Sequence, residues 1–275
     1  MSLIDQELRM SDIIPRRDPP TLTVAVLAKN ESHQIERCLR SAAFADEIIV
    51  VDSGSTDDTV VLAERMGART FVHADWQGFA VQRNHLLAHA TGDYIFFLDA
   101  DEEITPALQA EIQAAVRSGQ RAVWKIEWSV VAYGKELTYF LSQSSLERLF
   151  RRDMVTRYEG AVHEHAVLTD PSAPRHVMKA RLRHFSRQSI KGSLQKLTQY
   201  AMLGAAKRAE AGKKGGVMRG LASGLAIFIR LYFLRLGFLG GGPGFLFCFF
   251  IALECFFRYA ALYYDRDRLT TDVGR

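Results

Sequence analysis

Short apolar runs alternate with segments of helical periodicity through the first half of the chain. Each run is rich in β-branched residues and is bounded by polar or glycine residues, as expected of buried strands. The strands predicted in this way are 21–28, 47–53, 68–74 and 94–98. Between them apolar residues recur every three or four positions, as at Ile35, Leu39 and Ala42, which predicts helices. Strands that alternate with helices indicate an α/β domain with a largely parallel sheet flanked by helices.

The rhythm changes after residue 120, where longer strands are predicted at 122–133 and 147–152, followed by a helix at 189–211. We therefore expect a flexible leader, a catalytic domain, and a basic and hydrophobic helical region, at 1–20, 21–188 and 189–275. The leader contains several acidic residues and no apolar run, so it does not resemble a signal peptide. The catalytic part is accordingly expected in the cytoplasm.

Two apolar blocks, 221–239 and 245–264, are joined by the glycine-rich stretch 240–244, which predicts a turn. Each block is close to the roughly 20 residues that span a bilayer. Charged residues inside the blocks make a plain spanning helix costly, namely Arg230, Arg235, Glu254 and Arg258. A helical hairpin in the membrane interface fits this pattern better. Two core helices packed on the catalytic domain, or true spanning helices, are the alternatives.

The formal net charge of +4 hides a strong asymmetry. Residues 1–174 hold 17 Lys and Arg against 26 Asp and Glu, whereas residues 175–275 hold 18 against 5. Such a basic segment attracts phosphates, either of nucleic acid or of an anionic membrane surface. Because it contains no RNA-binding motif or DNA-binding module, we expect the membrane surface and no nucleic acid. The three cysteines are scattered, which disfavours a disulfide scaffold or a zinc site.

Acidic residues follow three of the predicted strands. Ligands of an open parallel sheet bind beyond the carboxyl ends of its strands, where Glu31, Asp52 and the pair Asp99 and Asp101 are expected. Asp99 and Asp101 are two apart on an extended segment, so their carboxylates are expected on one side. They repel each other unless a cation lies between them, and Mg²⁺ or Mn²⁺ on a diphosphate supplies that charge. The alternative is an acidic loop that caps the next helix.

Asp52 begins the stretch 52–57 (DSGSTD), in which Gly54 permits a tight turn. A carboxylate at this place can accept hydrogen bonds from ribose hydroxyls or from a base N–H. It can also serve only the turn and the cap of the next helix. The chain has no GxGxxG after its first strand and no GxxxxGK[ST], which argues against a dinucleotide-binding fold and a P-loop NTPase.

Three motifs resemble the signatures of family 2 glycosyltransferases: 28–31 (AKNE), 51–57 (VDSGSTD) and 98–102 (LDADE). The chain is most similar to the bacterial lipooligosaccharide core β-1,4-glucosyltransferase group, over nearly its whole length. The resemblance implies a GT-A type nucleotide-diphospho-sugar transferase fold with a membrane-associating helical extension. The chain departs from the common pattern at Ala28, where Thr usually precedes Lys-Asn-Glu. A backbone contact to the base survives that change, whereas a hydroxyl contact does not.

The resemblance also implies roles for single residues. The nucleotide sugar would be bound by Ala28, Asn30, Glu31, Asp52, Ser53, Gly54, Arg83 and Asp99. Asp99 would touch the ribose or the divalent ion, and Asp101 would hold the ion and so take part in catalysis. Arg83 would lie near the diphosphate, although a solvated helix face is the alternative for this residue.

Inverting transfer needs a general base that deprotonates the attacking acceptor hydroxyl. Charge on the departing diphosphate must also be neutralised, which a metal ion and an arginine can do. The stretch 160–165 (GAVHEH) offers Glu164 as the base, with Glu102 and Glu103 as rivals. His163 or His165 would bind the metal or the acceptor, unless each is an ordinary surface or core histidine.

Arginines close to this stretch would face a phosphorylated acceptor, or would form a basic strand face: Arg148, Arg151 and Arg152. The hypothesis is transfer of glucose from UDP-glucose to a heptose of the lipid-linked lipopolysaccharide core. The enzyme would be peripheral or monotopic at the cytoplasmic face of the bacterial inner membrane. A polyprenyl phosphate or protein acceptor, or a non-enzymatic nucleotide-binding membrane scaffold, are the alternatives.

Overall fold

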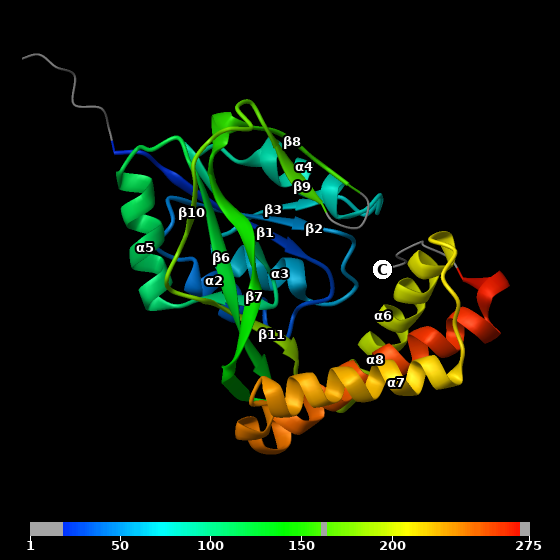
Figure 1. Cartoon of the computed structure of the whole chain (residues 1–275). Helices are drawn as coiled ribbons and strands as arrows, with labels where there is room; N and C mark the ends of the chain where they lie inside the picture. Colours follow the sequence, from blue (N-terminus) through cyan, green and yellow to red (C-terminus); the bar gives the residue numbers. More distant parts are fainter. Residues whose placement is uncertain (1–18, 161–163, 270–275) are drawn as a thin grey trace, which may run out of the picture.

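A computed structural model describes residues 19–160 and 164–269 of the chain, with a mixed sheet at its centre (Figure 1). The strand order is β3-β2-β1-β4-β7-β6-β11-β5, and β10 pairs with β6. The strands of this sheet are β1 Leu22–Ala28, β2 Glu47–Asp52, β3 Arg69–Val72, β4 Tyr94–Asp99, β5 Glu102–Ile104, β6 Val123–Ala132, β7 Lys135–Arg151, β10 Arg175–Val177 and β11 Leu182–Arg187. A separate antiparallel pair consists of β8 Val155–Glu159 and β9 His165–Leu168.

The four strands β1 to β4 are parallel to one another, as the alternation of strands and helices predicted. The sheet as a whole is mixed, because β7 runs antiparallel to both β4 and β6. The reversal occurs in the short connection between β6 and β7. Tyr133 and Gly134 both have positive φ there, 50° and 76°. Two consecutive residues of positive φ give the turn whose twist matches a β-hairpin.

Helices cover both faces of the sheet. They are α2 Ile35–Ser41, α3 Thr59–Arg65, α4 Phe79–His89 and α5 Pro106–Arg117. In β1, Val24 and Val26 belong to the apolar cluster shared with α2, α3 and α5, whereas Ala25 and Leu27 belong to the cluster shared with α4. A strand covered on both faces has a continuous apolar sequence, which explains the unbroken run of β1.

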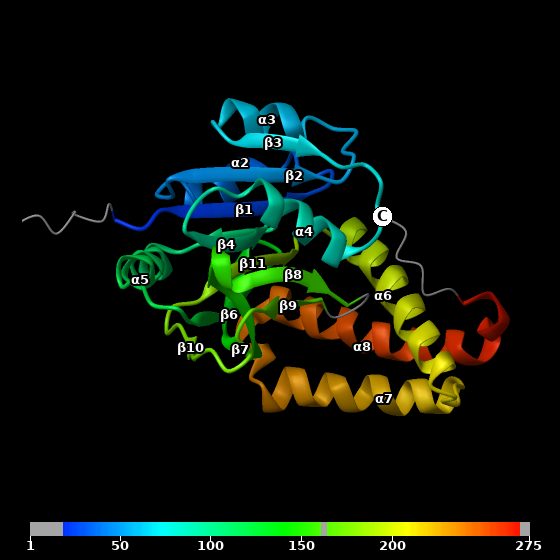
Figure 2. The same cartoon turned by 90° about the horizontal axis from the view of Figure 1, so that it is seen from above.

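The helical region consists of α6 Ile190–Glu210, α7 Val217–Ile229 and α8 Gly241–Tyr264. Figure 2 shows α7 on the outer side of α8. The two helices approach closely because Gly220 and Gly224 lie against the backbone of α8. A Cβ atom at these positions would be 2.8 Å from the carbonyl oxygen of Phe256 and 3.0 Å from that of Ala252. The other face of α7 is thereby turned outward.

The prediction of a turn at 240–244 is wrong. Gly241 to Gly244 form the first turn of α8, and the chain reverses earlier, at 235–240, where Leu236 has a φ of 57°. The first N–H groups of a helix have no partner within the helix, so Pro243 costs no hydrogen bond there. Glycine and proline therefore begin this helix rather than separate two helices.

The helical region is joined to the sheet by apolar packing and by one buried ion pair. Residues of the β6–β7 hairpin pack with Leu231, Phe247 and Cys248. Arg187 at the end of β11 pairs with Glu254 of α8, and both side chains are buried. These contacts hold α8 against the sheet, and α6, which packs on α8, lies beside the carboxyl ends of the parallel strands.

Candidate active site

The loops after β1 and β2 are tied together by hydrogen bonds. Oδ1 of Asn30 accepts from the backbone N–H of Thr56 at 2.8 Å, and the N–H of Asn30 donates to the Ser55 hydroxyl at 2.7 Å. The N–H of Glu31 donates to the hydroxyl of Thr59 at 2.8 Å. Asn30 has a φ of 55°, a left-handed conformation that asparagine tolerates better than most residues. These contacts form a preorganised edge at the carboxyl ends of β1 and β2.

Asp52 is buried and serves its own turn. Its Oδ1 accepts from the N–H groups of Gly54 at 2.9 Å and Ser55 at 2.7 Å, and its Oδ2 accepts from the Ser55 hydroxyl. Gly54 has a φ of 86°, and a Cβ there would be 3.1 Å from the Cβ of Ala74. The N–H of Ser53 donates to the carbonyl of Ala28 at 2.9 Å. The contacts of Asp52 are thus those of the turn, the alternative that the sequence left open.

Two buried arginines hold Asp99. Nη2 of Arg83 donates to Oδ1 of Asp99 at 3.2 Å, and Nη2 of Arg148 donates to Oδ2 at 2.9 Å. Burial alone would raise the pKa of Asp99, but the two guanidinium groups outweigh it and hold the pKa well below its usual range. The two guanidinium groups thus balance the charge of Asp99 within the protein.

Arg83 also brings Glu164 to this place. Its Nε donates to Oε1 of Glu164 at 3.2 Å, and the side chain of Glu164 is 21% exposed. Glu164 and Asp99 therefore share one arginine. A base candidate far away in the sequence thus lies beside the strand-end acids and remains accessible.

Glu102, a rival base, is completely buried. Its carboxylate accepts from the indole N–H of Trp128 at 2.7 Å, from Arg148 at 2.7 Å and from the N–H of Asp99 at 2.8 Å. Burial raises the pKa of Glu102 to about 7, against the opposing effect of Arg148. A carboxylate without solvent access cannot reach an acceptor hydroxyl, so Glu102 supports the fold. The other rival, Glu103, pairs with Arg183 at 3.3 Å.

Asp101 faces away from the two arginines toward β11 and α6. Its Oδ2 lies 3.3 Å from Nε2 of His184 and 3.9 Å from Nζ of Lys196. Burial acts to raise the pKa of Asp101, but the hydrogen bond with His184 outweighs it and lowers the pKa. Asp101 therefore remains a carboxylate at neutral pH.

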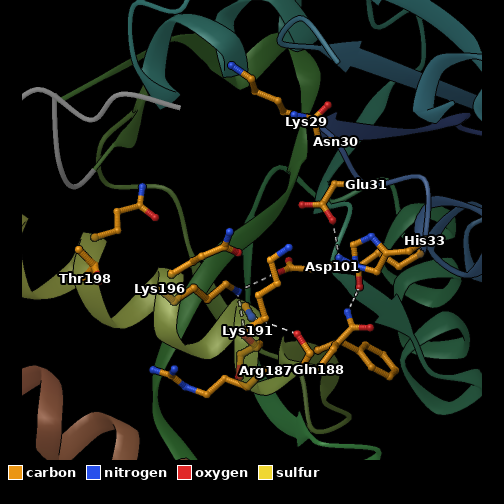
Figure 3. Close-up of a pocket in the computed structure, with 17 residues that line it drawn as sticks. Lys29, Asn30, Glu31, His33, Asp101, Arg187, Gln188, Lys191, Lys196 and Thr198 are labelled. Atoms are coloured by element: carbon orange, nitrogen blue, oxygen red, sulfur yellow. Dashed lines mark hydrogen bonds and ion pairs between the residues drawn. The ribbon is translucent and has the colours of Figure 1, made fainter. Parts of the chain in front are cut away.

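A cavity of about 1040 Å³ opens beside Asp101 (Figure 3). Asn30 and Glu31 line one side of it, and Lys191 and Lys196 of α6 line the opposite side. Its volume lies at the upper end of the range of about 300–1,000 Å³ for small-molecule sites. The cavity therefore has room for more than one sugar unit.

The residues that the structure describes contain no group of three or more His, Cys, Asp or Glu side chains placed to hold a metal ion. Asp101 and His184 nevertheless face each other, and a carboxylate oxygen and an imidazole nitrogen are metal ligands. Mg²⁺ in phosphate-transferring sites is typically held by one or two protein carboxylates plus substrate phosphates. The pair fits an ion whose other ligands come from a diphosphate. His163 lies outside the described residues.

A family model described as Glycosyl transferase family 2 matches residues 23–164, which is more than half of the chain. The chain belongs to glycosyl transferase family 2. An uncharacterized glycosyltransferase of Rickettsia bellii is 27% identical over 264 residues, 92% of this chain and 88% of the relative. The glycosyltransferase SunS of Bacillus subtilis is 32% identical over 162 residues, 58% of this chain and 38% of the relative. The protein is accordingly a transferase, with the GT-A type fold of a mixed sheet and flanking helices.

Solved structures similar to this family 2 glycosyltransferase include nucleotide-sugar enzymes. A glucosyl-3-phosphoglycerate synthase of Mycobacterium tuberculosis with Mn²⁺ and UDP has a TM-score of 0.40 at 25% identity, covering 50% of this chain and 58% of that one. S. aureus TarS with UDP-GlcNAc has a TM-score of 0.46 at 19% identity, covering 62% and 59%. Both TM-scores are below 0.5, so these likenesses assign neither donor nor metal to this transferase.

Three residues expected at the acceptor do not reach the cavity of the transferase. Arg151 pairs with Tyr94 at the amino-terminal end of β4, and Arg152 donates to the carbonyl of Gly92 at 2.9 Å. They lie at the opposite edge of the sheet, because β7 runs antiparallel to β4. His165 is 62% exposed and lies 3.5 Å from Glu159 on the β8–β9 pair.

Sequence reasoning missed three residues that the transferase places at the cavity. They are Arg187 and Lys196, which line the cavity, and His184, which contacts the cavity residue Asp101. No motif surrounds them, and their only signal was the basic segment that follows residue 174. That segment was interpreted as a membrane-facing surface, whereas part of it turns inward.

Proposed function

We propose that this family 2 glycosyltransferase moves glucose from UDP-glucose to a heptose of the lipopolysaccharide core. The observation that carries the proposal is the convergence of Asn30, Glu31 and Asp101 on one cavity at the carboxyl ends of parallel strands. Ligands of open α/β sheets bind at such a place. The nucleotide lies along the tied loops after β1 and β2, and the diphosphate lies toward Asp101 and Arg83.

Asp101 and His184 would hold Mg²⁺ or Mn²⁺ together with the diphosphate. When bound, the ion neutralises charge on the departing diphosphate. Arg83 is proposed to act toward the same end from beside Asp99 and Glu164, and its hydrogen bonds with both carboxylates hold the guanidinium in a fixed orientation.

Glu164 is the proposed general base. It accepts the proton of the acceptor hydroxyl while the hydroxyl oxygen attacks C1 of the donor sugar and the diphosphate leaves, with inversion at C1. Its hydrogen bond with Arg83 orients the carboxylate and leaves part of it exposed. Glu102 is unsuited to this role because it is buried.

The donor and acceptor assignments rest on the resemblance of the strand-end motifs to the lipooligosaccharide core glucosyltransferase group. The assay is transfer of radiolabelled sugar from UDP-glucose and other nucleotide sugars to a heptose-containing core linked to lipid A, with Mg²⁺ or Mn²⁺. Label is expected in the core fraction. Label in a polyprenyl phosphate or protein fraction would redirect the acceptor, and no transfer by folded protein from any nucleotide sugar would contradict the proposal.

The helical region is proposed to attach the enzyme to the cytoplasmic face of the inner membrane. Segments Val217–Leu234 and Gly237–Tyr264 are long and apolar enough to cross a membrane, yet only 17% and 39% of their hydrophobic windows are buried. The core helix of a soluble protein can have the same length and composition. A core helix is mostly buried, however, and α7 exposes large apolar side chains, including Met218, Leu221, Leu225 and Ile229.

The charges of α8 do not oppose attachment in the plane of the interface. Glu254 pairs with Arg187, and the side chain of Arg258 lies against Gly204 of α6, so both turn toward the rest of the protein. Basic residues near α7 add attraction to anionic lipids of about 1 kcal/mol each near the surface. The arrangement fits a hairpin lying in the interface.

Vesicle co-sedimentation tests the attachment. Leu225→Glu removes an exposed apolar contact from α7 and is expected to weaken binding to anionic vesicles about tenfold or more. Val61→Glu is the matched control, because Val61 is also exposed but lies on α3 of the catalytic body. Equal binding of both variants and of the wild-type protein would contradict attachment through α7.

A further inference from the structure

The side of the cavity formed by β11 and α6 has a distinct chemical character. We call it the α6 wall, and its residues are Arg187, Gln188, Lys191, Gln195, Lys196 and Gln199. Each side chain is either a cation or an amide. Amides both donate and accept hydrogen bonds, as sugar hydroxyls do, and cations only donate. The wall therefore suits a ligand with hydroxyls and anionic groups.

The α6 wall offers no apolar surface for a lipid chain. The only large apolar side chain among the lining residues that the structure describes is Phe185. Its ring is covered by the guanidinium of Arg37, whose Cζ lies 3.5 Å from the ring centroid. A polyisoprene chain bound beside its phosphate would need apolar contacts that this wall does not provide.

The three cations of the α6 wall differ in whether groups of the protein already balance their positive charge. Arg187 is buried against Glu254. Lys196 donates to the carbonyl of Ser186 at 2.7 Å and lies 3.9 Å from Asp101. Lys191 is exposed and forms no hydrogen bond or ion pair with any residue that the structure describes. One cation facing the cavity is thus uncompensated within the described part of the protein.

Lys191 also lies in the first turn of α6, after the N-cap Ser189, where the partial positive charge of the helix terminus adds to its own. It faces the cavity from the side opposite Asn30 and Glu31, with Asp101 between the two sides (Figure 3). A donor on the strand-end side places its transferable sugar near Asp101. The molecule that contacts the α6 wall is then the acceptor.

We infer that the α6 wall is an acceptor subsite for an anionic glycan, in which Lys191 binds a phosphate or carboxylate group and the glutamines bind neighbouring hydroxyls. The inference rests on the proposed transferase site and adds the class of acceptor. It also moves the expected anion contact from Arg151 and Arg152, at the other edge of the sheet, to α6.

The test uses the full-length protein and a water-soluble acceptor, so that membrane attachment plays no part. The acceptor is a deacylated, heptose-containing core oligosaccharide that carries phosphate and carboxylate groups. It is compared with the same oligosaccharide after phosphatase treatment, after carboxyl reduction, and after both. Initial rates give KM for each acceptor, and calorimetry in the presence of UDP gives the binding constants without need of transfer.

Lys191→Ala is expected to raise KM and Kd for the anionic glycan about tenfold, the size of one lost hydrogen bond to a charged group. Values for the fully neutral glycan and for UDP are expected to stay unchanged, and Lys191→Arg is expected to restore binding. Lys179→Ala is the control, because it removes the same charge from an exposed site next to α5. The single treatments tell which group, phosphate or carboxylate, Lys191 binds.

Equal loss of anionic and neutral glycan binding in Lys191→Ala, or weaker UDP binding, would overturn the inference. Equal affinity of the wild-type protein for the two glycans would overturn it as well. The calorimetric result stands even where no sugar is transferred. The protein could fail to transfer sugar and still bind the anionic glycan more tightly than the neutral one in a way that depends on Lys191. That outcome would contradict the proposed function but not the subsite.

Discussion

The loop after β1, which is tied to the loop after β2, faces the α6 wall across the cavity, and the two sides are held in different ways. Asn30, Asp52 and Glu31 are fixed by short hydrogen bonds within and between the loops. The α6 wall consists of long side chains on one helix, of which Lys191 has no partner in the described part of the chain. We therefore expect the proposed donor side to be preorganised and the proposed acceptor side to adapt to its ligand.

Asp101 lies where the two sides meet, so its removal should have the largest effect. Asp101→Ala is expected to lower kcat on the order of 1,000-fold, because charge on the leaving diphosphate loses its compensation. Steady-state kinetics with unchanged circular dichroism would measure this. Asp58→Ala, an exposed carboxylate on the same edge that caps no N–H group, should keep wild-type activity. Similar kcat values for both variants would mean that Asp101 and the cavity beside it take no part in the transfer reaction.

Among the residues around Asp99, Arg148 is expected to contribute most to the stability of the fold. Arg148→Ala leaves Asp99 and Glu102 without their shared buried partner and is expected to lower the free energy of unfolding by about 3–5 kcal/mol. Arg151→Ala, three residues along the same strand, breaks a partly exposed pair with Asp153 and should cost about 0–1 kcal/mol. Urea unfolding measures both variants. A similar cost for the two would show that burial of the ion pair is unimportant.

A buried ion pair between Arg187 and Glu254 joins the acceptor side to α8. Arg187→Met or Glu254→Leu alone leaves one buried charge unpaired and is expected to cost about 3 kcal/mol. The double variant should cost less than either single variant, because no unpaired charge remains. Thermal unfolding of the wild-type protein, the two single variants and the double variant gives the double-mutant cycle. Additive costs would mean that this pair does not couple α8 to the α6 wall.

The smallest effect is expected from pH acting on the tied loops. Hydrogen bonds from Thr59 and Ser32 outweigh the opposing effect of burial and lower the pKa of Asp57 to about 2. A lowered carboxyl pKa stabilises the folded state above the unfolded value, and this contribution is lost as pH falls from about 4 to about 2. Asp57→Asn should lack this loss. Urea unfolding at pH 5 and pH 2.5 compares Asp57→Asn with the wild-type protein. An identical pH dependence of the free energy of unfolding would mean that Asp57 does not cause the loss of stability.

The strand-end side was largely predictable from sequence, because its signals are local. Apolar runs placed β1, β2 and β4 within one or two residues. The four first strands are parallel as predicted. Tight turns and strand ends are short-range features, so residues adjacent in sequence, such as 52–57, are also adjacent in space.

The α6 wall could not be predicted, because it depends on how distant segments pack. Arg148 and Arg151 are three residues apart, yet one reaches Asp99 and the other reaches Gly119 at the far edge of the sheet. The antiparallel direction of β7, together with the alternation of its side chains between the two faces of the sheet, decides which one enters the site. His184 likewise meets Asp101 because β11 pairs with β5. Such pairings are long-range and leave no motif in the sequence.

The double anchoring of Asp99 by Arg83 and Arg148 has a consequence for the enzyme between turnovers. Since the protein balances this charge by itself, we expect folding to be independent of divalent ions. We expect a chelator to abolish transfer while the melting temperature stays the same. When the ion is scarce, the transferase would then stay folded but inactive. Transfer would begin again once nucleotide sugar and ion bind together.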